Sequence, residues 1–109
     1  MTFTDPEVGA VGLTEAQARD AGLRVTVGHA SIPKAARGWI NEAAGIVKLV
    51  ADADRGVLVG GTVLAPYGGE VLGLLTAAVH AEIPVETLRG MHYAYPTFHR
   101  AIAAALDGL

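Results

Sequence analysis

Two β-rich runs that stand on either side of a four-residue turn constrain the fold of this chain more than any other feature. Residues 46–52 and 57–64 are rich in Val, Ile and Leu, and Ala53-Asp54-Arg55-Gly56 separates them. Strands joined by so short a connection run antiparallel, and Asp and Gly favour the backbone conformations that a tight turn requires. The sequence therefore predicts a β-hairpin within an antiparallel sheet.

The segment before the hairpin predicts one helix between two extended stretches. Thr14 and Gln17 have the spacing of a capping box, which predicts a helix over residues 15–21, and Gly22 supplies its stop. The extended stretches are residues 4–13, before the helix, and residues 23–32, a strand that Pro33 ends.

The segment after the hairpin predicts three helices. Apolar residues recur at helical spacing from Gly69 to about Ala81, and their face is wide enough to imply burial on two sides. Pro84 breaks this pattern and starts a short helix over 85–90, and a terminal helix runs from Thr97 to about Leu106. The order β-α-β-β-β-α-α-α predicts an α+β fold, an antiparallel sheet with helices packed mainly on one face.

Composition excludes several classes of function. The formal net charge is −3 with only eight scattered Lys and Arg residues, so we expect neither a nucleic acid nor a membrane surface as partner. No cysteine is present, which excludes disulfides, a thiolate nucleophile and Cys-ligated metals in this chain. The longest apolar stretch, 71–79, is too short to span a bilayer, and no signal-like layout opens the chain. We expect a single domain over residues 1–109, located in the cytoplasm.

Two glycine pairs and four histidines invite readings as ligand sites. Gly60-Gly61 and Gly68-Gly69 do not fit a dinucleotide or Walker fingerprint. We interpret the first pair as a place in a strand where glycine allows a bulge or the close approach of a helix, and the second pair as a helix start. The histidines, which lack the spacing of a zinc hydrolase, predict no metal site: His29, His80, His92 and His99. We expect His29 to face solvent and His80 to be partly buried with a polar partner.

Three further segments carry aromatic residues with two open readings each. Trp39 either packs in the core or stacks on a partner, and Tyr67 either takes part in a subunit contact or packs within its own turn. The third segment is His92-Tyr93-Ala94-Tyr95-Pro96-Thr97-Phe98-His99-Arg100. Pro96 restricts φ and cannot donate a hydrogen bond, so this corner is expected to be rigid, either as part of an active site or as a small-ligand pocket.

Several segments, in order, resemble the carboxyl-terminal interface (dimerisation) domain of the flavin-dependent pyridine nucleotide–disulfide oxidoreductases, the group of glutathione, lipoamide and mercuric reductases. Residues 3–15, which include Thr4-Asp5-Pro6-Glu7, are similar to its opening segment. Gly45-Ile46-Val47-Lys48-Leu49-Val50 and Gly60-Gly61-Thr62-Val63-Leu64-Ala65-Pro66 resemble its central hairpin. The resemblance implies an α+β domain that pairs two subunits, so that the tail of one reaches the flavin and substrate cleft of the other.

The resemblance breaks at the catalytic positions. In disulfide-reducing members a His precedes the Pro-Thr and a Glu follows, forming an acid–base pair that protonates a leaving thiolate. Tyr95 and Arg100 stand at these positions here. A phenol of ordinary pKa near 10 is a poor proton shuttle at neutral pH, and an arginine cannot accept a proton. The departure disfavours ordinary disulfide reduction. The Tyr-Pro-Thr corner also resembles that of the soluble pyridine nucleotide transhydrogenases, and it is equally compatible with reduction of a quinone or another small acceptor.

The resemblance also implies functional sites and partners for this chain. Candidate catalytic residues are Tyr95, Arg100 and His99, with His92 as another possible proton donor, and Tyr95, Pro96 and Thr97 would contact the flavin of the partner subunit. The resemblance implies that FAD and NAD(P) bind to a larger parent protein with upstream FAD- and NAD(P)-binding domains. We expect no cofactor bound to this chain alone and no activity of it in isolation. We expect a homodimer formed through residues 69–81, Tyr67 and the terminal helix. The alternatives are a free-standing homodimeric interaction module and a small-ligand-binding domain.

Overall fold

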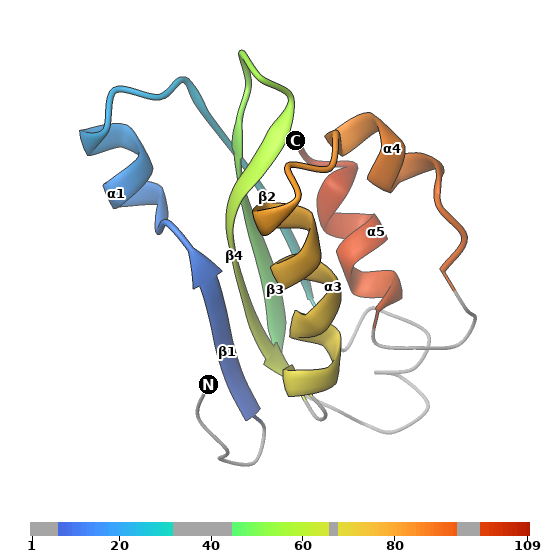
Figure 1. Ribbon diagram of the computed structural model, residues 1–109. Coiled ribbons are helices and arrows are strands. Elements are labelled where there is room, and N and C mark those ends of the chain that lie inside the picture. The colour runs from blue at the N-terminus through green and yellow to red at the C-terminus, as the bar shows by residue number, and fades with distance from the viewer. Residues whose placement is uncertain (1–6, 32–44, 66–67, 94–98) are drawn as a thin grey trace.

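The computed structural model describes residues 7–31, 45–65, 68–93 and 99–109, and shows a four-stranded antiparallel sheet with helices (Figure 1). The strands are β1 (Glu7–Gly12), β2 (Val25–Ser31), β3 (Ile46–Asp52) and β4 (Val57–Ala65). The helices are α1 (Glu15–Asp20), α3 (Gly68–His80), α4 (Val85–Gly90) and α5 (Arg100–Leu106). The order across the sheet is β1-β4-β3-β2, so the connection through α1 carries the chain from one edge of the sheet to the other.

The β3–β4 hairpin is confirmed, and one buried carboxylate organises its turn. Asp52 is 3% exposed, and its Oδ1 accepts hydrogen bonds from the main-chain N of Asp54 at 3.0 Å and of Arg55 at 3.4 Å. Gly56 closes the turn at φ +66°, a conformation that glycine adopts without a steric cost. The register shifts between Val50 and Ala51, which marks a β-bulge.

Helix α1 begins as its sequence predicts. Thr14 Oγ1 accepts a hydrogen bond from the main-chain N of Gln17 at 3.1 Å, and Gln17 Oε1 accepts one from the N of Thr14 at 3.0 Å. This reciprocal capping box satisfies two main-chain donors that a helix start would otherwise leave open. Gly22 follows the helix at φ +82°, as expected of a residue that stops a helix.

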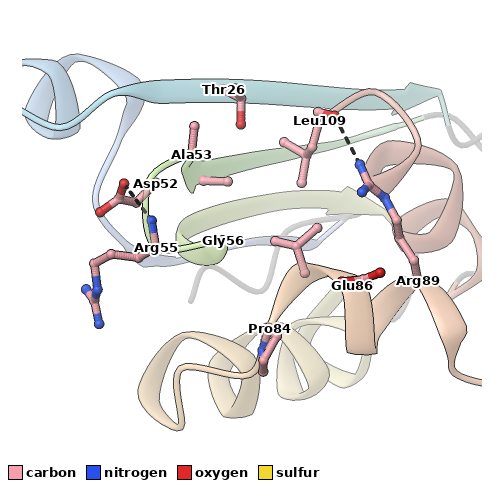
Figure 2. Close-up of a pocket in the computed structure, with 11 residues that line it drawn as sticks. Thr26, Asp52, Ala53, Arg55, Gly56, Pro84, Glu86, Arg89 and Leu109 are labelled. Carbon is pink, nitrogen blue, oxygen red and sulfur yellow. Dashed lines mark hydrogen bonds between the residues drawn. The ribbon is translucent and has the colours of Figure 1, made fainter.

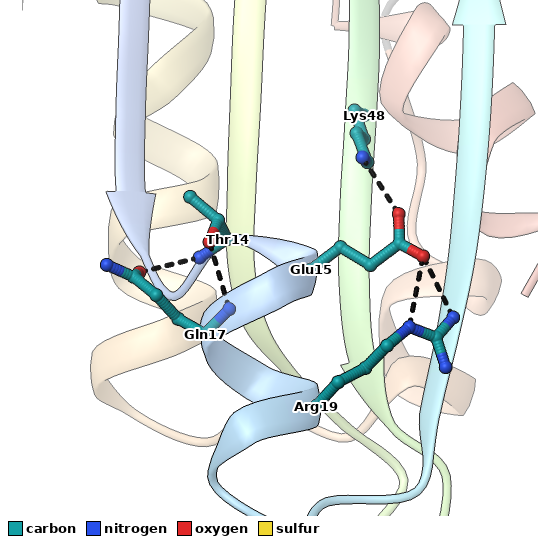
Figure 3. A network of polar contacts seen from close by, with 5 residues as sticks. All are labelled: Thr14, Glu15, Gln17, Arg19 and Lys48. Atoms are coloured by element: carbon teal, nitrogen blue, oxygen red, sulfur yellow. Dashed lines mark hydrogen bonds and ion pairs between the residues drawn. The ribbon is translucent and has the colours of Figure 1, made fainter.

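A network of charged side chains ties α1 to the sheet (Figure 3). The Glu15 carboxylate accepts from Arg19 at 2.8 Å, one helical turn further on, and from Lys48 of β3 at 3.0 Å. The hydrogen bond from Arg19 and then that from Lys48 lower the pKa of Glu15. Lys48 lies between Val47 and Leu49, both in the core, so by strand alternation it points to the opposite face, and α1 is tied to that face.

The other three helices cover one face of the sheet (Figure 1), so the predicted α+β arrangement is confirmed. The core joins this face to α3, α4 and α5, and its largest fully buried side chains are Leu49, Leu58, Leu75, Leu88, Ile102, Leu106, Val47, Val63 and Val71. Within the described ranges, no helix is both long enough and apolar enough to cross a bilayer.

The apolar residues of helix α3 lie as predicted, but His80 at the end of this helix does not. Val71, Leu75 and Ala78 are buried, and half-buried residues widen this face on both sides: Leu72, Leu74 and Val79. His80 is exposed, so the prediction that it is partly buried is wrong. It follows Val71 by nine residues, about two and a half helical turns, which places it on the opposite side of the helix. His29 is exposed, as predicted.

The last helix begins later than the sequence pattern indicates. The structure places its first residue at Arg100, after a turn at His99, whereas the apolar pattern extends it back to Thr97. Thr97 and Phe98 lie outside the described residues, as do Trp39 and Tyr67. Pro96 cannot donate a main-chain hydrogen bond, so a sequence pattern near it defines the helix start only to within a few residues.

Candidate functional site

Helices α4 and α5 stand on either side of the connection that contains the predicted site. Tyr95, Pro96 and Thr97 lie in this connection, residues 94–98, outside the described residues. The described structure resumes at His99, ahead of α5, and ends before the connection at Tyr93. The structure therefore describes the two flanks of the predicted site.

Tyr93 anchors the first flank to α4. Its side chain is half-buried, and its Oη donates a hydrogen bond to the main-chain O of Leu88 at 2.7 Å. Desolvation by burial raises the pKa of the Tyr93 phenol above its ordinary value of 10.0. A phenol that is protonated at neutral pH and already donates to a carbonyl is suited to holding the chain rather than to transferring a proton.

Arg100 and His99 form the second flank. Arg100 is exposed at the start of α5, and its Nη1 donates to the main-chain O of Tyr93 at 3.3 Å, which joins the two flanks directly. His99 is half-buried in a helical conformation (φ −58°, ψ −26°), and its main-chain O accepts from the N of Ile102 at 2.9 Å. His92 is exposed on the first flank. The structure thus places both candidate proton donors near the connection.

Arg89 is a residue of this region that the sequence reasoning missed. It lies in the last turn of α4, and its guanidinium donates through Nε and Nη2 to the main-chain O of Leu106 at 3.2 and 2.9 Å. The same Nη2 donates to the main-chain O of Leu109 at 3.0 Å (Figure 2). A basic residue near a helix end was the available signal, but its target lies 17 residues further along the chain, which no local pattern specifies.

The glycine pairs serve packing, as their interpretation predicts. A Cβ on Gly60 would lie 1.8 Å from the main-chain O of Leu13, and one on Gly61 would lie 3.0 Å from Leu75 Cδ1 of α3. At the start of α3, the main-chain N of Gly69 donates to Glu7 Oε1 at 3.0 Å. A carboxylate of β1 therefore holds a donor that a phosphate would need at this helix start.

A cavity of about 420 Å³ lies between the hairpin turn, the start of α4 and Leu109 (Figure 2). Three of its charged lining groups already have partners: Asp52 accepts from the turn, Arg55 pairs with Glu82, and Arg89 donates to the end of α5. Neither flank of the 94–98 connection contributes to the lining, so this cavity is not the pocket predicted at the aromatic corner.

The exposed side of α3 carries small side chains between two polar ones. Glu70, Gly73, Ala77 and His80 follow one another at spacings of three and four residues, and all four are exposed. A Cβ built on Gly73 would meet no atom within 4 Å in the described part of the chain. Among the described residues, no three His, Asp or Glu side chains are grouped so that they could hold a metal ion.

Comparison with known proteins identifies the chain by family. The family model described as the pyridine nucleotide-disulphide oxidoreductase dimerisation domain matches residues 1–106. Dihydrolipoyl dehydrogenase of Mycobacterium leprae is 37% identical over 110 residues, which cover 99% of this chain and 23% of that protein. Mercuric reductase of Streptomyces lividans is 35% identical over 106 residues, covering 96% and 22%.

Solved structures agree with the fold. The crystal structure of LpdA from Mycobacterium tuberculosis superposes with a TM-score of 0.89 at 28% identity, over 96% of this chain and 23% of that one. The HOCl-induced flavoprotein disulfide reductase RclA from Escherichia coli superposes with a TM-score of 0.90 at 22% identity, over 96% and 24%. The present sequence spans less than a quarter of the length of these relatives. The chain belongs to the dimerisation-domain family of the pyridine nucleotide–disulphide oxidoreductases.

Proposed function

We propose that this chain is the dimerisation domain of an FAD- and NAD(P)-dependent oxidoreductase whose upstream domains bind the two cofactors. Support comes from a family match over residues 1–106 together with a length less than a quarter of that of the relatives. In this proposal the domain pairs with a second copy of itself and is inert in isolation. The cytoplasmic location predicted from the sequence stays a prediction.

The exposed side of α3 is the proposed contact between the two copies, together with Tyr67 and the terminal helix. Gly73 and Ala77 present little side-chain bulk there, so a second helix could approach closely. A glycine in a helix interior costs about 1 kcal/mol relative to alanine, and nothing described within 4 Å of Gly73 requires it. A close contact with a partner subunit would explain its presence.

Tyr95, Pro96 and Thr97 are the proposed contact with the flavin of the partner subunit. Tyr95 would lie against the flavin as a hydrogen-bond donor or an aromatic wall, with His99 as the candidate proton donor beside Arg100 at the start of α5. Because Tyr95 and Arg100 replace the acid–base pair of the resemblance, we propose an acceptor other than an ordinary disulfide. The described residues offer no dinucleotide cradle: Gly60 and Gly61 pack inside the fold, and Gly69 N already donates to Glu7.

Analytical ultracentrifugation of the chain tests the proposed dimer. The wild type is expected to sediment as a dimer at micromolar concentration, Gly73→Arg as a monomer, and Gly73→Ala as a dimer. Urea unfolding of Gly73→Arg under dilute, monomeric conditions should show a fold at least as stable as the wild type, because the side chain points away from the core and arginine favours a helix more than glycine does. A wild type that is monomeric at every concentration would contradict the proposed contact.

The polypeptide translated from the complete reading frame tests the cofactor assignment. We expect a bound flavin, seen by its visible absorbance, that NADH or NADPH reduces, and a slower turnover with disulfides than with a quinone. Tyr95→Phe should leave flavin reduction by NAD(P)H unchanged, because that half-reaction does not involve the tail of the partner. A reading frame with no dinucleotide-binding sequence would favour the free-standing module, and binding of a small ligand by the chain alone would favour the ligand-binding domain.

A further inference from the structure

The last turn of α4 is joined to both ends of α5. At the carboxyl end of α5, Arg89 of α4 donates three hydrogen bonds, two to Leu106 O and one to Leu109 O. At the start of α5, Arg100 Nη1 donates to Tyr93 O, and Tyr93 Oη donates to Leu88 O of α4. Every one of these contacts runs from a side chain to the main chain, so each one depends on where the backbone of the other element lies.

The hydrogen bonds of Arg89 hold the carboxyl end of α5. Leu106 O also accepts from the main-chain N of Leu109 at 3.2 Å, a bond within the same short turn, and a helix of seven residues has few internal hydrogen bonds to hold it. Packing holds α5 on the sheet through Ala101, Ile102, Ala105 and Leu106, all buried. Apolar packing is not directional, whereas a planar guanidinium with several donors specifies the orientation of its acceptors.

We propose that Arg89 is a positioning residue for Tyr95-Pro96-Thr97: by capping the end of α5 it fixes this helix relative to α4, and so fixes both ends of the connection that carries the three residues. The inference rests on the proposed function for the role of that connection. Tyr93 and Arg100 hold the start of α5 to α4 in the same way, and we call these contacts of Arg89, Tyr93 and Arg100 the clamp. Arg89 touches no cofactor in this assignment and acts only through the two helices.

Hydrogen exchange of the chain, followed residue by residue, tests the clamp. Arg89→Leu is expected to speed exchange of the α5 amides at least tenfold while leaving those of β3 and β4 at the wild-type rate. Arg89→Lys, which keeps a donor but not the planar fork, should fall between the two. Arg24→Leu is the matched control, because that guanidinium donates to Asp54 at 2.8 Å with both side chains about two-thirds exposed, and it should leave α5 unchanged.

A second readout follows the part of the clamp at the start of α5. The ring carbon Cζ of Tyr93 reports its titration, and Arg89→Leu should move the pKa of Tyr93 down toward that of a free phenol, because a loosened α5 lets water reach the ring. Wild-type exchange of α5 in Arg89→Leu would overturn the proposal. If Arg89→Leu fails to fold, Arg89→Lys decides: faster exchange confined to α5 supports the clamp, and an equal change in all elements overturns it.

The consequence for chemistry is tested in the polypeptide from the complete reading frame. There, Arg89→Leu should slow reoxidation of the flavin by its acceptor about tenfold and leave reduction by NAD(P)H at the wild-type rate. An equal effect on both half-reactions would overturn the positioning role. The exchange experiment needs neither flavin nor a second copy, so a failed clamp and a failed cofactor assignment give different results.

Discussion

Gly28 of β2 lies directly against the main chain of Ala105 in α5: a Cβ on Gly28 would stand 2.0 Å from the Ala105 oxygen and 3.3 Å from Leu109 Cγ. Main-chain atoms cannot move aside as the end of a flexible side chain can. The end of α5 is therefore seated on β2 because residue 28 has no side chain, and the same end of the helix carries the carbonyl that Arg89 caps.

Gly28→Ala should consequently destabilise the fold by about 1–3 kcal/mol, the usual cost of forcing a methyl group into a packed interior. Urea unfolding measures the change. Gly73→Ala is the matched control, because its Cβ meets no described atom within 4 Å, and there the helix should gain up to about 1 kcal/mol. Equal stabilities of the two variants would show that α5 does not approach β2 as described.

Asp52 provides a prediction about the hairpin turn. Asp52→Ala removes the acceptor of two main-chain N–H groups at a site that is 3% exposed, and should cost about 1–3 kcal/mol of folding free energy. Asp52→Asn keeps an acceptor oxygen in the same place and should cost clearly less. Thermal unfolding compares the two, and an Asn variant as unstable as the Ala variant would assign the effect to charge rather than to the turn.

Glu82 holds a positive φ of 50° just after α3, although it is not glycine. Its main-chain N and that of Ile83 close the helix end on Val79 O and Ala78 O, and its side chain pairs with Arg55. Glu82→Gly and Glu82→Ala both lose the ion pair, but only glycine relieves the left-handed conformation, so the Gly variant should be more stable by about 1 kcal/mol. Chemical unfolding of the pair measures this difference, and an Ala variant at least as stable would refute the strain.

The lowered pKa of Glu15 predicts a pH dependence. Its hydrogen bonds with Arg19 and Lys48 favour the charged form in the folded state, so this contribution is complete above the ordinary carboxyl pKa of 4.5 and is lost as the pH falls through the lowered value. The stability difference between wild type and Glu15→Gln should therefore be present at pH 7 and disappear in acid. Added salt should reduce it, because the pairs are partly exposed.

Glu86→Gln is the control for that titration, since Glu86 is exposed and forms no ion pair within the described part of the chain. A difference between wild type and Glu15→Gln that stays constant from pH 7 to pH 3 would contradict the assigned pairs.

Local patterns predicted the elements well where a residue acts on its near neighbours. The capping pair Thr14 and Gln17 and the turn before Gly56 involve residues at most four positions apart, and both form as predicted. His80 was misjudged because it lies on the exposed side of α3, with Gly73 and Ala77, and not on the apolar face that the pattern defines.

Contacts between distant residues were outside the reach of those patterns. Nothing near Arg89 in the sequence indicates Leu106 or Leu109 as its acceptors, and nothing near Lys48 indicates Glu15. In the sequence Tyr93 is one of several aromatic residues close together, and nothing there distinguishes it from Tyr95. Only the position of Leu88 O shows that the Tyr93 hydroxyl anchors the chain to α4.

By itself the sequence determined the hairpin, the helix caps, the α+β class and the family, because these follow from periodicity, turn chemistry and motifs read along the chain. Only the tertiary structure decided which strands lie on either side of the hairpin, that α5 is seated on Gly28, and that Arg89 closes the end of that helix. The physical reason is that close packing and hydrogen-bond geometry depend on the distance between elements in space, which separation along the chain does not specify.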